Sequence, residues 1–192
     1  MPSSDNFPSI SMETKDLKDL LIWWLNPVEL PPQKFLNIVY KNNLINEIHN
    51  FLKQEDYLIE KTDLSDSFLF QNLLEEYNLA FSFQNHILFS ELINKEEKLI
   101  EFKEFILKIS SILKPSSYFI LETKIESENE RNFLKELFLR NFEQVFFYVP
   151  LKKYATNPFT KFDLSKTNFC WIIAITNSSG EDPAEWLGEF FE

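Results

Sequence analysis

Glycine is nearly absent from this sequence of 192 residues: only Gly180 and Gly188 occur. Loops that bring the backbone close to a nucleotide need residues without a Cβ atom, and they often need positive φ angles. The sequence therefore argues against a glycine-rich cofactor loop anywhere before residue 180.

Cysteine and histidine are also scarce. Cys170 is the only cysteine, which excludes an intramolecular disulfide and any cysteine-built zinc or iron–sulfur site. His49 and His86 have no further ligand at a suitable spacing, so we expect no metal. His86 is the more interesting histidine because it follows an expected strand, although a structural role is the commoner one for such a residue. Cys170 lies in an apolar run and no G-x-S-x-G motif is present, so we expect no catalytic residue.

Basic residues are outnumbered, 19 to 30, which gives a net charge of −11. Such a surface repels phosphate backbones, and we expect no direct binding of nucleic acid. No apolar run is long enough to span a bilayer, and no secretory signal or transit peptide is visible. We therefore expect a cytoplasmic or nuclear protein.

What the sequence has in quantity is apolar residues, at 44%, enough for the core of one domain. Strands are predicted at residues 35–40, 57–61, 77–83, 118–122, 144–149 and 169–176, with helices at 44–52, 94–113 and around 133–138. This alternation predicts an α/β fold with a mostly parallel, Rossmann-like sheet and helices on both faces. The last two strands have no helix between them, so we expect an antiparallel hairpin at the edge of the sheet.

The chain divides into four expected parts. Residues 1–10 form a flexible lead, 11–33 an N-terminal helix and a proline-rich connector, 34–177 the α/β domain, and 178–192 an acidic aromatic tail. NPF at 157–159 matches a peptide-recognition motif, but Asn-Pro more plausibly turns the chain there.

Both ends of the chain carry large apolar side chains that could bind a partner. In the tail these residues recur at helical spacing and are surrounded by five acids, as in helices that bind in a partner's groove. The alternative is that they pack on their own domain, and the same two alternatives apply to the N-terminal helix. The partner-binding candidates are Trp186, Leu187, Phe190, Phe191, Trp23 and Trp24.

The segment SSILKPSSYFILETK, residues 110–124, carries a resemblance to a known family. It ends a helix, turns on Leu113, Lys114 and Pro115, and continues as an apolar strand closed by a glutamate. It resembles the class I S-adenosylmethionine-dependent methyltransferases, in which Leu-Lys-Pro-Gly-Gly leads into the fifth strand. Ser116 and Ser117 stand in place of the two glycines. The element order over residues 77–176 is similar to the second half of that fold.

The first half departs from the family. The resemblance implies a glycine-rich loop after the first strand, but FLNIVY is followed by KNNL. It also implies an acidic residue that binds ribose at the end of the second strand. Glu60 falls near that place, although a solvated strand-end carboxylate is the more common role for such a residue.

Only one further element fits between residues 61 and 77, so one element of the usual set is expected to be missing. This abbreviated layout resembles the N-terminal domain of the anamorsin family, whose later cysteine clusters have no counterpart here. We therefore expect a degenerate methyltransferase-like domain without a cofactor, which acts as a protein–protein interaction subunit or scaffold. The alternative is a divergent S-adenosylmethionine-dependent methyltransferase, helped by a partner subunit, with Glu60 as its candidate cofactor ligand.

Overall fold

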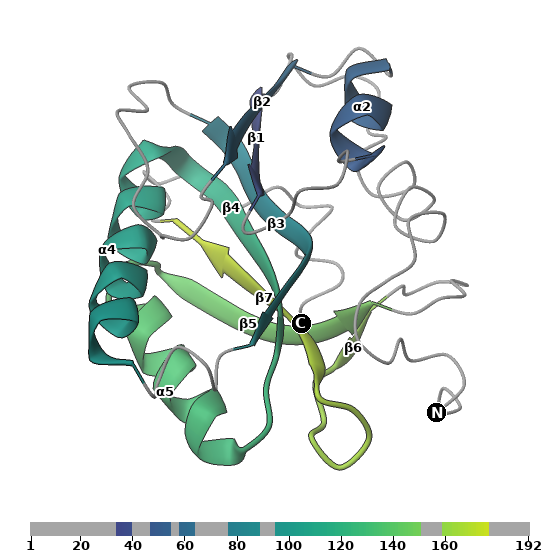
Figure 1. The fold of residues 1–192 in the computed structure, drawn as a ribbon. Coiled ribbons are helices and arrows are strands. Elements are labelled where there is room, and N and C mark those ends of the chain that lie inside the picture. The colour runs from purple at the N-terminus through teal and green to yellow at the C-terminus, as the bar shows by residue number, and fades with distance from the viewer. Residues whose placement is uncertain are drawn as a thin grey trace.

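The computed structural model describes residues 34–39, 47–54, 58–63, 77–88, 95–150 and 159–176 (Figure 1). Its strands are β1 Lys34–Val39, β2 Leu58–Asp63, β3 Tyr77–Leu88, β4 Leu113–Lys124, β5 Gln144–Pro150, β6 Phe159–Lys161 and β7 Phe169–Ile175. Its helices are α2 Glu47–Gln54, α4 Glu96–Ile112 and α5 Glu128–Leu139. The predictions for residues 1–33 and 178–192 lie outside these ranges.

The strands form one seven-stranded sheet in the order β2-β1-β3-β4-β7-β5-β6. Neighbouring strands from β2 to β4 are parallel, whereas β7 runs antiparallel to both β4 and β5. The predicted α/β fold with a mostly parallel sheet is confirmed.

The predicted antiparallel hairpin is confirmed: β7 pairs with β5 and lies beside the parallel strands, next to β4. β7 is not at an edge; it fills the space between β4 and β5. The crossover through α5 carries β5 two strand positions beyond β4, whereas the crossover through α4 joins the neighbouring strands β3 and β4. The chain then returns into the gap as β7.

The apolar pattern of the sequence did not predict two further features, the full length of β3 and the strand β6. In both, backbone hydrogen bonding continues where the apolar pattern has ended. β3 continues past residue 83 to Leu88 through a register shift between Ser82 and Ile87, so His86 lies in a strand and not after one. The short strand β6 pairs with β5 inside an otherwise polar stretch, and it buries Phe159 of the NPF motif.

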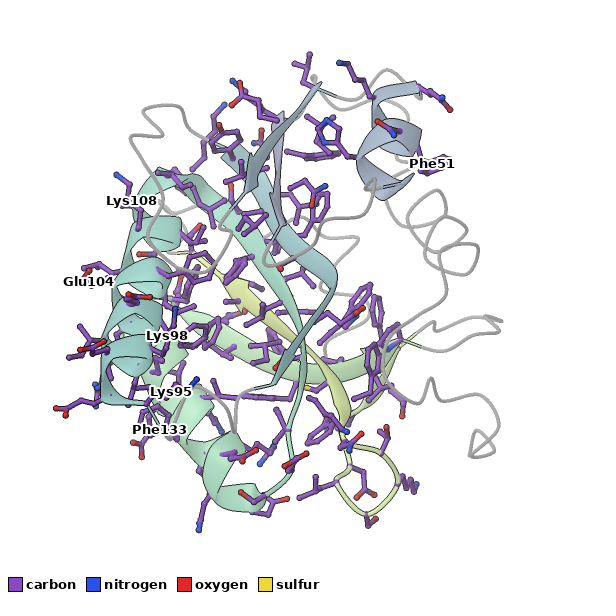
Figure 2. All side chains as sticks on the ribbon, viewed as in Figure 1. Phe51, Lys95, Lys98, Glu104, Lys108 and Phe133 are labelled. Carbon is purple, nitrogen blue, oxygen red and sulfur yellow. The ribbon has the colours of Figure 1, made fainter. Side chains whose placement is uncertain are left out.

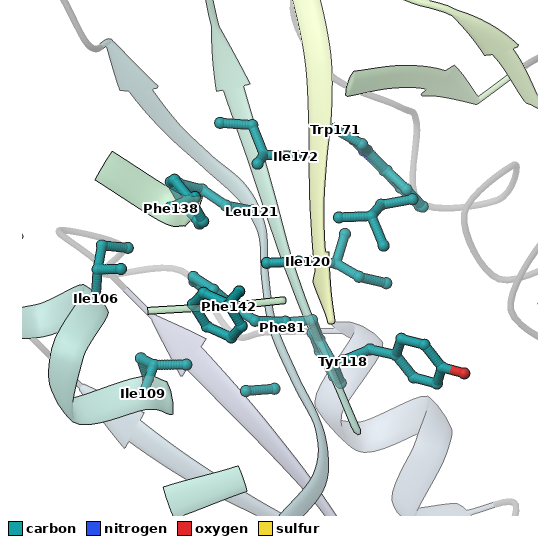
Figure 3. Packing of buried hydrophobic residues seen from close by; sticks show 14 of the residues in the cluster. Phe81, Ile106, Ile109, Tyr118, Ile120, Leu121, Phe138, Phe142, Trp171 and Ile172 are labelled. Carbon is teal, nitrogen blue, oxygen red and sulfur yellow. The ribbon is translucent and has the colours of Figure 1, made fainter. Parts of the chain in front are cut away.

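The two faces of the sheet differ in what covers them. Phe119 of β4 contacts Phe105 of α4 at 5.9 Å between ring centroids and Phe138 of α5 at 6.0 Å, so both helices cover one face, here called the first face. Because side chains alternate along a strand, Tyr118 and Ile120 point to the opposite, second face. Figure 3 shows Phe138 and Phe142 on one side of β4 and Tyr118 and Trp171 on the other.

α4 is amphipathic and has acidic residues in its first turn, which suits the positive end of the helix dipole. Phe102, Phe105, Ile106 and Ile109 are buried, whereas Glu104 and Lys108 point away from the sheet (Figure 2). This helix was predicted from its apolar spacing, and its existence and position are confirmed.

α5 begins at a hydrogen-bonded cap. The Ser127 hydroxyl accepts a hydrogen bond from the Glu130 backbone N–H at 3.2 Å, and the Glu130 carboxylate accepts one from the Glu126 N–H at 2.8 Å. A serine followed three residues later by a glutamate is the sequence signature of such a cap.

Among the helices of the described ranges, none combines the length and apolar character needed to cross a bilayer.

Candidate functional site

The chain changes direction along the sheet between β1 and β3. From β1 it continues to β2 on one side, and from β3 it continues to β4 on the other. In open α/β sheets, ligands bind outside the carboxyl ends of the strands at such a switch point. The carboxyl ends of β1, β2 and β3 therefore define the candidate site.

Asn37 is a buried polar residue on β1, two residues before the strand ends. Its side chain is 1% exposed, and its amide nitrogen has no hydrogen-bond partner among the residues that the structure describes. Asn37 lies beside Phe81 in the register of β1 and β3, so it points to the second face. An unsatisfied buried donor costs about 1–3 kcal/mol. This cost sets Asn37 apart from its apolar neighbours.

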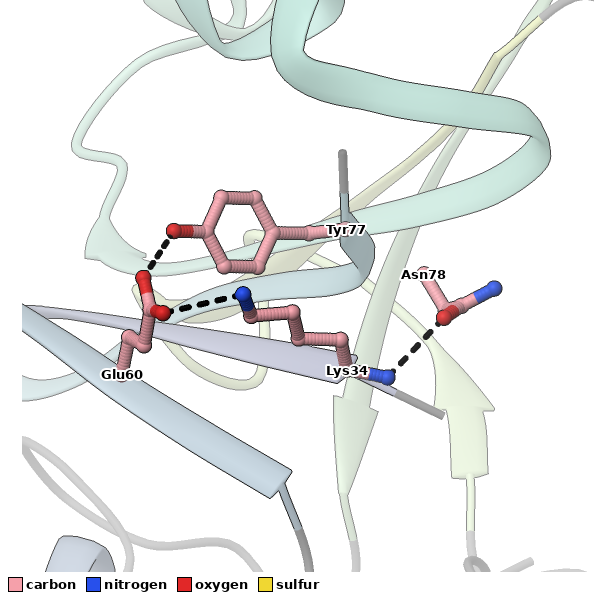
Figure 4. A network of polar contacts seen from close by, with 4 residues as sticks. All are labelled: Lys34, Glu60, Tyr77 and Asn78. Carbon is pink, nitrogen blue, oxygen red and sulfur yellow. Dashed lines mark hydrogen bonds and ion pairs between the residues drawn. The ribbon is translucent and has the colours of Figure 1, made fainter. Parts of the chain in front are cut away.

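Glu60 does not lie at the carboxyl end of its strand. It pairs in register with Leu36, and its side chain extends toward the amino ends of β1 and β3. Its carboxylate accepts a hydrogen bond from the Tyr77 hydroxyl and forms an ion pair with Lys34 at 2.9 Å (Figure 4). The Lys34 backbone N–H donates to the side-chain amide oxygen (Oδ1) of Asn78 at 2.9 Å. Glu60 therefore ties three strands together at the end of the sheet opposite the candidate site.

These contacts shift two pKa values. The hydrogen bond from Tyr77, and then the contact with Lys34, lower the pKa of Glu60 below its ordinary value. Burial, followed by the hydrogen bond to the Glu60 carboxylate, raises the pKa of Tyr77. The phenol thus stays protonated as the donor while the carboxylate stays ionised as the acceptor.

A lowered pKa makes the Glu60 contribution to stability depend on pH. The contribution is present above the ordinary pKa of 4.5 and is lost as the pH falls through the lowered value of the folded protein. Because the carboxylate is partly exposed, we expect Glu60→Gln to reduce the free energy of unfolding by about 0.5–1 kcal/mol at neutral pH. Thermal unfolding across a pH series should show this difference shrinking below pH 4.5.

The control for this series is Glu136→Gln, which changes an exposed carboxylate on α5. It should leave the free energy of unfolding nearly unchanged at every pH. A Glu60→Gln deficit that stays constant into acid would show that the carboxylate charge is not what stabilises the three strands.

Asp63, and not Glu60, is the acidic residue at the carboxyl end of the second strand, where the resemblance implies a ribose ligand. It is the last residue of β2 and pairs in register with Val39, the last residue of β1. The apolar pattern ends the second strand at Lys61, two residues early, because Thr62 and Asp63 carry no apolar signal. Hydrogen bonding to β1 extends the strand regardless of that signal.

Glu122 and Trp171 form a buried polar pair on the second face. They lie opposite each other on β4 and β7, are 3% and 0% exposed, and are joined by a hydrogen bond of 2.9 Å from the indole N–H to the carboxyl group. The sequence pattern identified Glu122 as the residue that ends the apolar run of β4. Its partner, 49 residues away, was not.

The histidines and the cysteine are separated from one another. His49 lies on α2, His86 on β3, and Cys170 is buried on β7, where burial raises the pKa of its thiol. Within the described ranges, histidine, cysteine and carboxylate side chains form no group that could hold a metal ion. The candidate partner residues in 11–33 and 178–192 lie outside the described ranges.

The turn at Leu113, Lys114 and Pro115 is part of β4 and holds the end of β7. The Ser117 N–H donates to the Thr176 hydroxyl oxygen at 2.9 Å, and that hydroxyl donates to the Lys114 carbonyl at 2.8 Å. The Thr176 N–H donates to the Ser117 carbonyl at 2.9 Å. A serine at position 117 is thus compatible with a tightly bonded turn, although the family has glycine there.

No family model and no curated protein matches the sequence. Solved structures do match the fold. Phosphoethanolamine N-methyltransferase 2 of Haemonchus contortus, in complex with S-adenosyl-L-methionine, is 14% identical with a TM-score of 0.52 over 89% of this chain and 40% of that chain. The CMeT domain of the citrinin polyketide synthase is 11% identical with a TM-score of 0.50 over 84% of this chain and 56% of that one.

These similarities confirm the predicted class of fold. The chain has the methyltransferase-like α/β fold of class I S-adenosylmethionine-dependent methyltransferases, at low sequence identity. It spans about 40% of the length of the Haemonchus enzyme.

Proposed function

We propose that this chain is a catalytically inactive methyltransferase-like domain that acts as a protein–protein interaction subunit or scaffold in a larger assembly. One observation carries the proposal. β1 ends at Val39 beside the switch point, and the residues that follow, 40–46, contain no glycine. In this fold the resemblance places the cofactor against that loop, where a Cβ atom would fill the space that the ligand needs.

S-adenosylmethionine does not fit the residues present in the way that the resemblance implies. The loop cannot offer glycine backbone to the ligand, and the carboxylate oxygens of Glu60 already contact Tyr77 and Lys34 at the opposite end of the sheet. A ribose ligand at Glu60 would have to break both contacts. We therefore derive no reaction through this cofactor.

A divergent methyltransferase is the second candidate, and two residues favour it. Asp63 stands at the strand end where an acidic ribose ligand would be needed, and Asn37 offers a buried amide nearby on β1. In this case a partner subunit would supply the close backbone contacts that the loop lacks.

Calorimetry with S-adenosylmethionine and with its demethylated product separates the two candidates. We expect no binding by the isolated protein tighter than about 100 μM, which corresponds to about 5 kcal/mol. The Asp63→Asn variant is the matched control: if binding is seen and this change removes it, the divergent methyltransferase is the correct candidate.

The proposed partner is a protein, bound through Trp186, Leu187, Phe190 and Phe191 of the tail together with Trp23 and Trp24. Buried aromatic anchors dominate the energetics of such interfaces. The chain enters β1 at Lys34, at the amino end of that strand. It leaves β7 at Ile175, which pairs with Tyr118 in the amino-terminal half of β4. The chain segments before β1 and after β7 therefore join the sheet at the same end, the amino end of its parallel strands. One partner surface could therefore reach both.

We propose no direct contact with nucleic acid, because the net charge of −11 opposes it. Filter binding to random duplex DNA and RNA at low salt should give no micromolar affinity. Micromolar binding that weakens steeply with added salt would instead reveal a basic patch assembled in three dimensions.

A further inference from the structure

β2 is the strand at one end of the sheet. It comes first in the strand order and β6 comes last (Figure 1). Among the strands of the described ranges, β2 pairs with β1 alone. The backbone N–H and C=O groups of a strand point alternately to its two sides, so every second residue of Leu58–Asp63 directs them away from β1. These outward groups form a template for a further strand.

The outer edge of β2 is regular. Its register with β1 runs without a bulge from the pair Lys34 and Leu58 to the pair Val39 and Asp63. The strand contains neither proline nor glycine. Edge strands that are protected from pairing are typically very short, bulged or interrupted by proline, or they carry lysine. β2 has one lysine but no bulge and no proline, so its backbone remains able to pair.

The fold has a place for a strand beyond β2. In the classic doubly wound order, 3-2-1-4-5-6, a third strand lies outside the second. In the part of the chain that the structure describes, the order ends at β2. A strand added there would extend the sheet in a direction that this class of fold permits.

We propose that the outer edge of β2 binds an extended segment of a protein partner, which pairs with Leu58–Asp63 as an added strand. Such strand addition takes its affinity from main-chain hydrogen bonds and its specificity from alternate side chains. The inference rests on the proposed function, because it names a surface at which the interaction subunit receives its partner.

The side chains beside this edge indicate the chemistry of the partner segment. Leu58 is 53% exposed, and the Glu60 carboxylate, two residues later on the same face, is 43% exposed. Glu60 can accept further hydrogen bonds beside its contacts with Lys34 and Tyr77. The net charge of −11 also favours a basic partner. An apolar residue and, two residues away, a lysine or arginine would complement this edge.

Charge argues against a second copy of this chain as the occupant. In an antiparallel pair related by a two-fold axis, directly opposite side chains share a face, so a strand crosses its copy at a residue and not between two residues. The two central registers place Glu60 opposite Glu60, or Lys61 opposite Lys61, of the second copy. Like charges directly opposite each other destabilise a strand pair. A partner segment of different sequence avoids this repulsion.

Amide hydrogen exchange in the full-length protein tests the pairing at the backbone. In the isolated protein, NMR should show fast exchange at every second amide of residues 58–63, at rates independent of protein concentration. In the native assembly, isolated from cells through a tag on this chain, mass spectrometry should show exchange of the same residues slowed at least about tenfold.

Two matched variants link this protection to partner binding. Leu58→Asp introduces a charge at the edge of β2, whereas Ile100→Asp changes an apolar side chain of similar exposure, 51%, on α4. We expect Leu58→Asp to reduce the amount of retained partner at least about tenfold and Ile100→Asp to leave it unchanged. Circular dichroism verifies the fold of both variants. If Leu58→Asp does not fold, the exchange rates of the unmodified protein decide the question.

Several results would overturn the proposal. Slow exchange of all the β2 amides in dilute isolated protein would show that the chain covers its own edge. Slow exchange that appears only as the concentration rises would assign the edge to a second copy. Unchanged exchange in an assembly that holds a partner would reject the edge pairing and leave the interaction role intact. A chain that retains no partner would reject the interaction role itself, and the pairing with it.

Discussion

Changing both Trp186 and Phe190 to alanine is expected to abolish co-purification of the native partner while barely altering the thermal midpoint of the isolated protein. Each aromatic anchor of an interface is worth about 2 kcal/mol or more, so the pair should weaken binding by roughly a thousandfold. The measurement combines affinity isolation of the tagged full-length protein from its native cells with thermal unfolding of the same variant.

The control for the tail is Leu139→Ala, which removes a 45% exposed apolar side chain at the end of α5. It should leave both the partner and the midpoint unchanged. The contrary result is a tail variant that keeps its partners and unfolds roughly 10 °C lower or more, since truncating a buried aromatic costs about 3–5 kcal/mol. That result would place the tail in the core of its own domain.

The second large effect is expected at the Glu122–Trp171 pair. Trp171→Phe keeps an aromatic ring near Phe159, whose centroid lies 5.9 Å from that of Trp171, but it removes the indole donor to the buried carboxyl group. A hydrogen bond within a protein contributes about 0.5–1.5 kcal/mol, and a buried acceptor that loses its donor adds a desolvation cost of about 1–3 kcal/mol. We expect the thermal midpoint to fall by roughly 4–8 °C.

A double-mutant cycle isolates this contribution. Glu122→Leu should also destabilise, because it takes away the acceptor that the structure shows for the indole. The double variant should be less destabilised than the sum of the two single changes, by about 1–3 kcal/mol, since replacing both halves of a buried polar pair is cheaper than replacing one. Additive losses would show that the hydrogen bond does not couple the two strands.

Local patterns in the sequence were sufficient for the elements and the class of fold. Apolar spacing identified α4 and α5, and short apolar runs identified β1, β4, β5 and β7, because burial acts on each element through its own periodicity. The turn on Leu113, Lys114 and Pro115 identified the family resemblance. The lack of glycine after β1, which carries the proposed function, is likewise a property of the sequence alone.

Tertiary structure alone decided the rest, because those features join residues that are distant in the chain. The apolar pattern predicts Glu60 near the end of the second strand, but pairing with β1 extends β2 to Asp63. The Glu60 carboxylate instead contacts Tyr77 and Lys34. The insertion of β7 between β4 and β5 pairs strands that are distant in the chain, and no local pattern encodes it. The sequence by itself determined which segments are buried and that the usual cofactor loop is lacking. The fold decided which polar groups meet, since that depends on register and on long-range pairing.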